Sequence, residues 1–484
     1  MKKYRYRRTL LTFLGLLCVT ASASASTSDN DQWFEAFKRT ADDATLFKFL
    51  YAMPKGGDLH IHLSGSIHPE WLWRLSLEAE ADGFRYYTKV RINNCRHATN
   101  EYGGNAYLLL YKTVVHYDYE KLDACEQGEF ELLQDLNDEQ KARWMNALRL
   151  DQAFEGRNEF FEAHWPRLGS LGNAKIMAET IYLNMQHFGA EGVRYIEGQV
   201  PIHGFRDQNG VPVSPDEVLE IYRERISRAD AKATGVTLRF QVAILRFHPQ
   251  AESILRHDYA FASRHPDVVA LNLVGREDND KGYPLRFLDT LRDMRRTHSG
   301  VRLSIHAGEV DEPNQHVRDT LLLGAERIGH GVNLITDPDT MLLMRRNQFL
   351  VEVNLVSNLL LEYVSDYSQH PFPEYLRTNI PVALGTDDRG MWDSTMTDEF
   401  FVAVKEFNLS WSEIRLLLNN SIKFSFAEEE VKARLLKALN DDLDKFSARV
   451  KRKGGAAYAT DKSLQKVEPQ YRGFICRQYE ICPP

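Results

Sequence analysis

The chain has 484 residues, of which 43% are hydrophobic and 26% charged. This composition is ordinary for a globular protein and excludes collagen-like, repetitive and wholly disordered classes. The formal net charge is −8, and loss of residues 1–25, which carry five basic and no acidic side chains, would change it to −13. An acidic chain is a poor binder of nucleic acid backbones and is compatible with a small-molecule substrate.

The first 25 residues have the form of a secretory signal peptide. A basic head between Lys2 and Arg8 precedes the apolar run Leu10–Val19, and small-residue cleavage sites follow at residues 21–25. The apolar run is shorter than the roughly 20 residues that a membrane span needs. We therefore expect an exported protein, periplasmic or secreted, that has no membrane association once residues 1–25 are removed.

Four cysteines follow this segment, and an even number in an oxidising compartment suggests disulfides. We favour the local pairs Cys95–Cys125 and Cys476–Cys482, with free buried thiols as the alternative. The sequence alone leaves the connectivity open.

Eight candidate strands begin near residue 58, and most are β-branched or Leu-rich without strict alternation. This pattern is typical of parallel strands that are covered on both faces. Helical patterns lie between most of them, as in Pro215–Ala233, Tyr283–Thr297, Pro313–Leu323 and Asp337–Arg346. The alternation predicts an α/β fold, a (β/α)₈ TIM-type barrel over residues 55–450. The expected strands are Asp58–Leu63, Val193–Val200, Thr237–Ile244, Val268–Val274, Arg302–His306, Arg327–Gly331, Phe349–Leu355 and Val382–Thr386.

The spacer after the first strand is too long for one helix. We interpret residues 84–149, approximately, as an insertion over the barrel mouth that Cys95–Cys125 would tie together, with a simple chain of helices as the alternative. Residues 26–54 form an N-terminal segment, helices are expected near Ser410–Phe424 and Glu428–Val450, and a polar tail covers residues 451–484.

Polar residues at four strand ends form a candidate zinc site. His60 and His62 are two apart on a strand, so their side chains share one face. His306 and Asp387 end two other strands, and active sites of such barrels lie at these carboxyl ends. Alone, a His-x-His pair is more often structural than a ligand pair. Three imidazoles and one carboxylate together make a plausible zinc shell.

Three further residues are candidates for proton transfer: Glu309, His330 and Asp388. Glu309 follows His306 after Ala-Gly, and His330 lies between two glycines. Asp388 adjoins Asp387, and burial of two adjacent carboxylates needs a cation or a shared proton. Taken singly, a solvated loop Glu, a loop His and an exposed Asp-Asp turn are the ordinary interpretations.

These motifs together resemble the adenosine deaminase family of the amidohydrolase superfamily, over roughly residues 53–440. The chain also resembles the secreted growth-factor branch of that family in three features. These are Met53-Pro54-Lys55-Gly56, the signal peptide and the cysteine-bearing insertion. That branch has a longer N-terminal dimerisation extension than this chain, so an oligomer is possible but not implied by that route. The matching stretches are Leu59-His60-Ile61-His62-Leu63, Ser304-Ile305-His306-Ala307-Gly308-Glu309, Arg327-Ile328-Gly329-His330-Gly331, Gly385-Thr386-Asp387-Asp388, Leu273-Val274-Gly275-Arg276-Glu277 and Asn420-Ser421-Ile422-Lys423-Phe424-Ser425-Phe426.

The resemblance implies a role for each matching residue. Glu309 would protonate N1 of a purine, and His330 with Asp388 would orient and deprotonate the attacking water. Gly275 would contact the purine ring through its backbone. The zinc ligands, for one Zn²⁺ per chain, would be His60, His62, His306 and Asp387.

One position departs from the family pattern. Adenosine deaminases carry Asp two residues after the second His, and relatives that act on N6-substituted nucleotides carry Asn, whereas this chain has Ser64. That residue lies near the ribose end of the substrate in the family, so a nucleoside and a 5′-phosphorylated substrate both stay open.

The expected function is zinc-dependent hydrolytic deamination of adenosine or a related 6-aminopurine nucleoside, giving an inosine-type product and ammonia. An N6-substituted or 5′-phosphorylated substrate is the alternative, as is another amidohydrolase with two metals. Those enzymes commonly place a lysine on the fourth strand, and Val268–Glu277 has none. A non-catalytic binding or signalling barrel is the third possibility. Deaminases with a Cys-x-x-Cys zinc motif are excluded because no such motif occurs.

Overall fold

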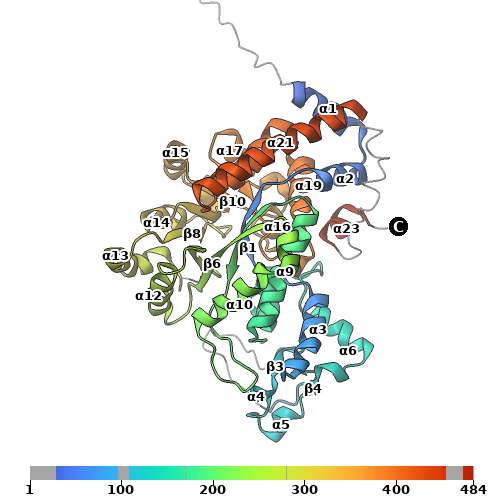
Figure 1. The fold of residues 1–484 in the computed structure, drawn as a ribbon, viewed down its shortest axis with the longest axis vertical. Helices are drawn as coiled ribbons and strands as arrows, with labels where there is room; N and C mark the ends of the chain where they lie inside the picture. The colour runs from blue at the N-terminus through green and yellow to red at the C-terminus, as the bar shows by residue number, and fades with distance from the viewer. Residues whose placement is uncertain (1–28, 96–107, 169–170, 280, 454–472, 483–484) are drawn as a thin grey trace, which may run out of the picture.

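Eight parallel strands form a barrel at the centre of the molecule (Figure 1). A computed structural model describes residues 29–95, 108–168, 171–279, 281–453 and 473–482. The strands follow one another around the sheet in chain order. They are β1 Gly57–His62, β5 Tyr195–Val200, β6 Thr237–Leu245, β7 Val268–Val274, β8 Arg302–Ala307, β9 Arg327–His330, β10 Leu350–Val353 and β11 Val382–Leu384.

The barrel closes between its first and last strands. Ile61 forms a parallel bridge with Asp387, and two backbone hydrogen bonds flank it, from His62 N to Asp387 O at 3.1 Å and from Asp387 N to His60 O at 2.9 Å. Closure brings the carboxyl ends of all eight strands to one rim. The predicted α/β TIM-type fold is confirmed, and the predicted strands match the observed ones closely.

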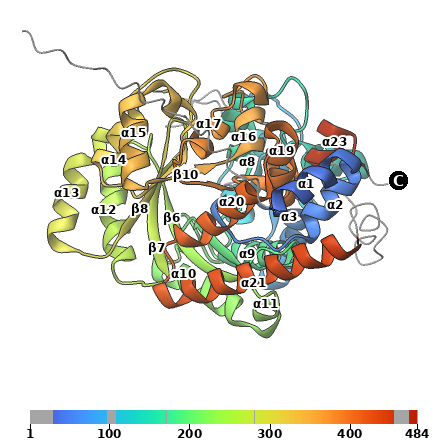
Figure 2. The same ribbon diagram turned by 90° about the horizontal axis from the view of Figure 1, so that it is seen from above.

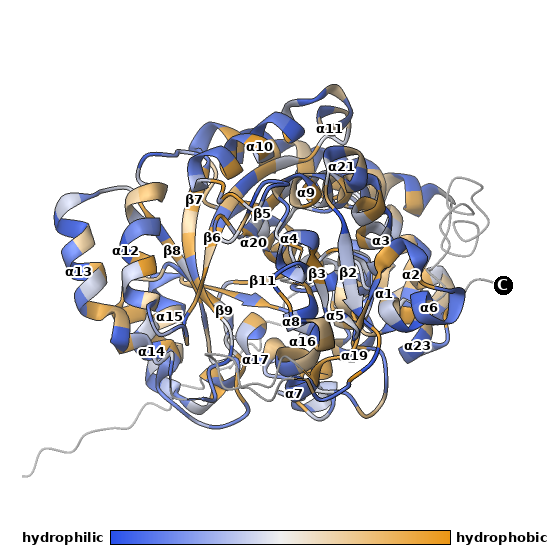
Figure 3. Ribbon diagram, turned by 90° about the horizontal axis from the view of Figure 1, so that it is seen from below, coloured by the Kyte–Doolittle hydropathy of each residue, from blue (hydrophilic) through white to orange (hydrophobic). Residues whose placement is uncertain are grey.

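Helices surround the barrel and cover the outer face of its strands (Figure 2). The strands are mainly apolar with polar residues between the apolar ones, and the outward faces of the helices are largely hydrophilic (Figure 3). Buried residues fill both sides of the strands, which is why they lack alternation. The helices between strands are α9 Ala174–Ala190, α10 Pro215–Ser227, α12 Ala251–Ala262, α13 Leu288–Thr297, α14 His316–Leu322, α15 Pro338–Asn347 and α17 Phe372–Arg377.

One predicted helix is wrong in its length. The structure divides Pro215–Ala233 into α10 and α11 (Ala229–Ala233), because Arg228 between them is extended with φ −67° and ψ 157°. The start of α10 follows the sequence signal. Ser214 accepts a hydrogen bond from Glu217 N in a capping box, and Pro215 occupies the first turn.

The long spacer after β1 contains a small antiparallel sheet rather than a simple chain of helices. After α3 (Pro69–Glu78), the strands β2 (Tyr86–Lys89), β3 (Thr113–Val115) and β4 (Phe130–Leu132) pair in the order β3-β2-β4. Figure 1 shows them at the end of the molecule opposite α21. With α6 (Asp138–Asn146) they enclose a second apolar cluster.

Both favoured cysteine pairs are disulfides in the structure. Cys95 bonds to Cys125 within the insertion. Cys476, in α23 (Phe474–Tyr479), bonds to Cys482, which follows that helix. The free-thiol alternative therefore does not apply to these four residues.

Terminal helices close the amino end of the barrel. In the N-terminal segment α1 (Asp29–Thr40) and α2 (Asp43–Ala52) pack against the C-terminal helices through aromatic rings, including Phe34 and Phe49 on Trp411. The C-terminal helices are α19 Met396–Phe407, α20 Trp411–Lys423 and α21 Glu429–Lys453.

Some predictions fall outside the described residues. These are the signal peptide at residues 1–25, residues 96–107 of the insertion and most of the tail after residue 453. Within the described ranges, no helix combines the length and the apolar character that crossing a membrane requires.

Candidate metal-dependent active site

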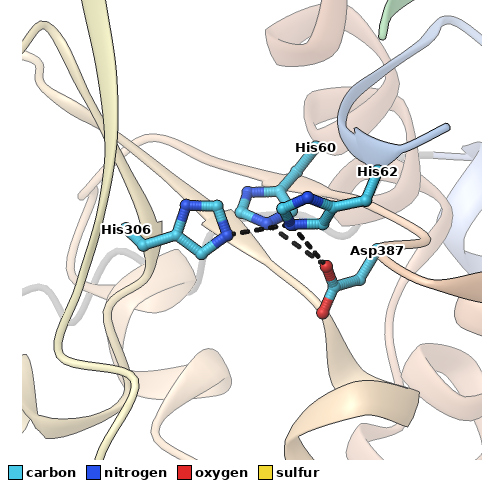
Figure 4. Close-up of side chains that lie close together, drawn as sticks. All are labelled: His60, His62, His306 and Asp387. Carbon is cyan, nitrogen blue, oxygen red and sulfur yellow. Dashed lines mark hydrogen bonds and ion pairs between the residues drawn. The ribbon is translucent and has the colours of Figure 1, made fainter. Parts of the chain in front are cut away.

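Four side chains from three separate parts of the chain meet at the carboxyl rim of the barrel (Figure 4). His60 and His62 come from β1, His306 from β8, and Asp387 from the residues after β11. One ligand atom from each lies within 4.8 Å of every other. The Nε2 atoms of His62 and His306 are 3.1 Å apart, and Asp387 Oδ1 lies 3.2 Å from His62 Nε2 and 3.5 Å from His60 Nε2.

Hydrogen bonds on the far side of two rings turn their Nε2 atoms toward this centre. His60 Nδ1 lies 2.8 Å from Glu352 Oε2, and His306 Nδ1 lies 2.8 Å from Asn272 Oδ1. Such partners fix the tautomer and the orientation of metal-binding imidazoles. Glu352 in turn pairs with Arg327 at 2.6 Å.

The donor set fits a divalent cation. Among the described residues, His60 Nε2 and Asp387 Oδ1 are buried without a hydrogen-bond partner. Burial lowers the pKa of His62 and of His306, which favours the neutral rings that a metal needs. Burial opposes a charge on His60 too, but the nearby carboxylates of Asp387 and Glu352 raise its pKa to about 10, so an ion would displace a proton from Nε2. Three imidazoles and one carboxylate are a zinc-binding set.

Glu309 and Asp388 lie beside this centre with raised pKa values. Burial, Asp387 and Glu277 raise the pKa of Glu309 well above its ordinary value. Burial and then the adjacent Asp387 raise the pKa of Asp388. Carboxyl groups with raised pKa values are candidates for a general acid and, where a cation lies close by, for a general base.

A chain of hydrogen bonds sets the tautomer of His330. Phe372 N donates to His370 Nδ1 at 3.1 Å, so the proton of a neutral His370 is on Nε2, 3.0 Å from Asn358 Oδ1. The Asn358 amide nitrogen then donates to His330 Nδ1 at 3.0 Å. Burial lowers the pKa of His330 to about 3, so the ring is neutral with its proton on Nε2, which lies 3.7 Å from Glu309.

Glycines provide the space for these side chains. A Cβ on Gly65 would lie 1.7 Å from Asp388 Oδ1, and one on Gly329 would lie 2.7 Å from His60 Cε1. Gly329 is therefore needed at this position because a side chain there would collide with the ring of the candidate ligand His60.

A cavity of about 280 Å³ opens beside His62. Ser64 and Val274 line it, and Trp165 covers it with its ring centroid 6.1 Å from that of His62. Gly275 follows Val274 with φ 92°, where a Cβ would meet Phe247 at 2.6 Å. The structure thus brings the four candidate ligands and the three proton-transfer candidates together. It places Ser64 in the wall of the adjoining cavity and Gly275 directly after the lining residue Val274.

Several site residues were missed by the sequence interpretation. Glu352 and Asn272 lie inside strands that are otherwise apolar. A polar residue at a buried strand position needs a hydrogen-bond partner, and this could have identified both residues as site candidates. No sequence pattern identifies Asn358 and His370, because they do not face the candidate metal centre themselves and contribute by orienting the ring of His330.

A closed barrel with a candidate metal site and buried carboxyl groups at its carboxyl rim is an arrangement suited to a metal-dependent hydrolase. A family model described as adenosine deaminase matches residues 146–442. The chain therefore belongs to the adenosine deaminase family, and it is a deaminase, a hydrolase that acts on a C–N bond.

The relatives deaminate several aminopurines. The adenine deaminase of Aspergillus fumigatus is 24% identical over 406 residues, which cover 83% of this chain and 98% of that protein. The adenosine deaminase of Serratia proteamaculans is 28% identical over 55% of this chain and 77% of its own length. The N6-Methyl-AMP deaminase-L of Xenopus laevis is 29% identical over 52% of this chain and 71% of its own length.

Solved structures share the fold. The adenine deaminase of Arthrobacter aurescens aligns with a TM-score of 0.59 at 20% identity, covering 81% of this chain and 99% of that one. The N6-methyl-AMP deaminase of Arabidopsis thaliana aligns with a TM-score of 0.56 at 21% identity, covering 82% and 99%. At these identities the likeness concerns the fold.

Proposed function

We propose that this protein is a zinc-dependent deaminase that hydrolyses the 6-amino group of adenosine or a related aminopurine nucleoside, with one Zn²⁺ per chain. The convergence of the four ligand atoms within 4.8 Å, beside a carboxyl group with a raised pKa, carries the proposal. His60, His62, His306 and Asp387 would hold the ion. A zinc-bound structure of a fold relative from Burkholderia ambifaria supports the choice of metal.

The reaction adds water to C6 of the purine and releases ammonia. Zinc supplies the Lewis acidity that makes water a nucleophile at neutral pH. Glu309 gives its proton to ring N1, so negative charge does not accumulate on the base. His330 holds the attacking water through its Nε2 proton, and Asp388 accepts the proton that the water loses. Asp388 then passes its proton to the amino group, the C6–N bond breaks and ammonia leaves. The hydroxyl at C6 loses its proton, which restores Glu309, and C6 becomes a carbonyl carbon.

The choice of substrate is supported by the relatives, whose names include adenine, adenosine and N6-methyl-AMP deaminases. All three contain a 6-aminopurine ring and differ in what the ring carries. Ser64 and Gly275 would contact the substrate outside the reacting centre, the first near its ribose and the second on its ring.

We also propose export to the periplasm or beyond. The basic and apolar pattern of residues 1–25 supports it, and so do two disulfides, which persist in oxidising compartments.

Ammonia release from a panel of aminopurine bases, nucleosides and nucleotides tests the proposal. We expect activity with at least one member, loss of activity after chelation and return with zinc, at one ion per chain. Absence of ammonia from every member with zinc-loaded protein would contradict deamination. Two ions per active chain would favour the two-metal amidohydrolase.

A further inference from the structure

We infer that Gln199 binds the polar edge of the purine ring, in a cavity built for an uncharged base or nucleoside rather than a nucleotide. This inference rests on the proposed function, because it concerns the same site. Gln199 lies on β5 directly beside His62 on β1, in parallel register. It also lines the 280 Å³ cavity.

The cavity is mainly apolar, with few polar side chains. At about 280 Å³ it is smaller than the roughly 300–1,000 Å³ of many ligand pockets, which favours a small ligand. Its apolar wall includes Ile67, Leu171 and Phe205. The polar side chains that line it are His62, Ser64, Asn173, Thr180, Gln199 and His203.

Three of these polar groups are committed to protein partners. Thr180 Oγ1 donates to a backbone carbonyl at 2.9 Å. Asn173 accepts from Lys175 N at 2.9 Å and donates to Tyr86 at 3.3 Å. His203 Nε2 lies 2.6 Å from Asp258 Oδ1.

Gln199 is different, because its amide has no partner within the described structure. It is 1% exposed, and both its Nε2 and its Oε1 are buried without a hydrogen bond. On the adjacent strand, Gln241 is equally buried, yet it donates to Leu59 O and Glu197 and accepts from Asn272. A buried amide left unpaired is costly, so a ligand that pairs with it gains affinity and specificity.

The amide offers one donor and one acceptor side by side. A purine presents such an edge wherever a ring nitrogen adjoins an N–H group, and glutamine binds adenine in this way in other contexts. Because Gln199 lies beside the metal ligand His62, the ring is the part of the substrate that it reaches. We therefore assign it to the base rather than to the sugar.

The charge of the cavity decides against a nucleotide. Among its described lining residues there is no lysine or arginine. A hydrogen bond to Asp258 raises the pKa of the lining residue His203, and that carboxylate would balance the charge of a protonated ring. A phosphate group needs arginine, lysine or several N–H donors when it leaves water.

Calorimetry of the binding of hypoxanthine, inosine and IMP to the zinc-loaded protein tests both the role of Gln199 and the preference for an uncharged ligand. We expect inosine or hypoxanthine to bind at least about tenfold more tightly than IMP. Gln199→Leu should lower the affinity for hypoxanthine and the affinity for inosine by about tenfold each, as loss of a buried hydrogen-bonded pair does. It should not lower the melting temperature of the protein. The matched control is Thr180→Val, which changes the same cavity but removes a hydroxyl that is bonded to the backbone, and should bind as the parent does.

The inference is overturned if IMP binds as tightly as inosine, if Gln199→Leu binds both ligands like the parent, or if none of the three binds. Ammonia release from adenine and adenosine is measured on the same preparations. Binding without any turnover would contradict the proposed function and leave the binding inference standing, so the two failures are distinguishable.

Discussion

Glu309 is buried beside Asp387 and Glu277, and burial together with these carboxylates raises its pKa. The raised pKa favours the protonated carboxyl group, which is the form that can donate a proton to the ring. Gln has the same size but no acidic proton. We expect Glu309→Gln to bind zinc as the parent does and to lose about 100-fold or more of its turnover. Metal analysis and ammonia release measure the two effects, and a zinc-loaded variant with parental turnover would contradict the role.

Gly65 sets the position of Asp388. Because a Cβ there would lie 1.7 Å from Asp388 Oδ1, Gly65→Ala must displace that carboxyl group. Asp388 is not a metal ligand in this account, so we expect zinc content to stay at the parental level while kcat falls at least about tenfold. Loss of zinc in parallel with activity would show instead that the substitution disturbs Asp387.

At this scale the sequence was sufficient for residues whose chemistry appears at strand ends. His60, His62 and Asp387 could be predicted because residue type and position coincide there. Glu352 and Asn272 could not be assigned to particular imidazoles, because the pairing depends on which strands face each other across the barrel. The uncommitted amide of Gln199 is visible only when all its neighbours are known.

At the scale of elements, the start of α19 combines a helix cap with a titrating group. Asp398 accepts hydrogen bonds from the Thr395 backbone and hydroxyl, and burial nevertheless raises its pKa to about 7. The unfolded value is 3.8, so between about pH 4 and 7 the folded protein holds one more proton than the unfolded chain. This group therefore stabilises the fold fully below about pH 4, and that contribution is lost as pH rises through 7.

Asp398→Asn removes this titration and keeps an acceptor for Thr395. Each pH unit in the window is worth about 1.4 kcal/mol per proton at most. We expect the free energy of unfolding of the variant to fall less steeply between pH 5 and 7 than that of the parent. Urea unfolding at several pH values measures both slopes. Identical slopes would show that Asp398 is already ionised in the folded protein at pH 5.

The elements that were hardest to predict are the short ones. Most of the barrel strands are rich in Leu, Ile and Val, so they stand out in the sequence. In contrast, β3 and β4 have three residues each, which is too few for a period to be recognised. The break at Arg228 likewise has no proline or glycine to mark it, and it depends on how α10 and α11 pack.

For the whole molecule, the disulfide Cys95–Cys125 links residues 30 apart in the insertion. Closing a loop of that length is worth about 3–4 kcal/mol in the chain-entropy model, against about 2 kcal/mol for the six-residue separation of Cys476–Cys482. We expect the Cys95→Ser, Cys125→Ser double variant to have the lower melting temperature of the two double variants, with zinc content unchanged in both. Equal melting temperatures would show that the insertion is held by its apolar cluster alone.

The account depends on one divalent ion shared by side chains from β1, β8 and the end of β11. X-ray diffraction from a crystal of the zinc-loaded protein, measured at the zinc absorption edge, tests this directly. The account predicts a single anomalous peak per chain, about 2.0–2.2 Å from the nearest atoms of His60, His62, His306 and Asp387. A chain with no peak among these four residues, or with its peak on other ligands, would contradict it.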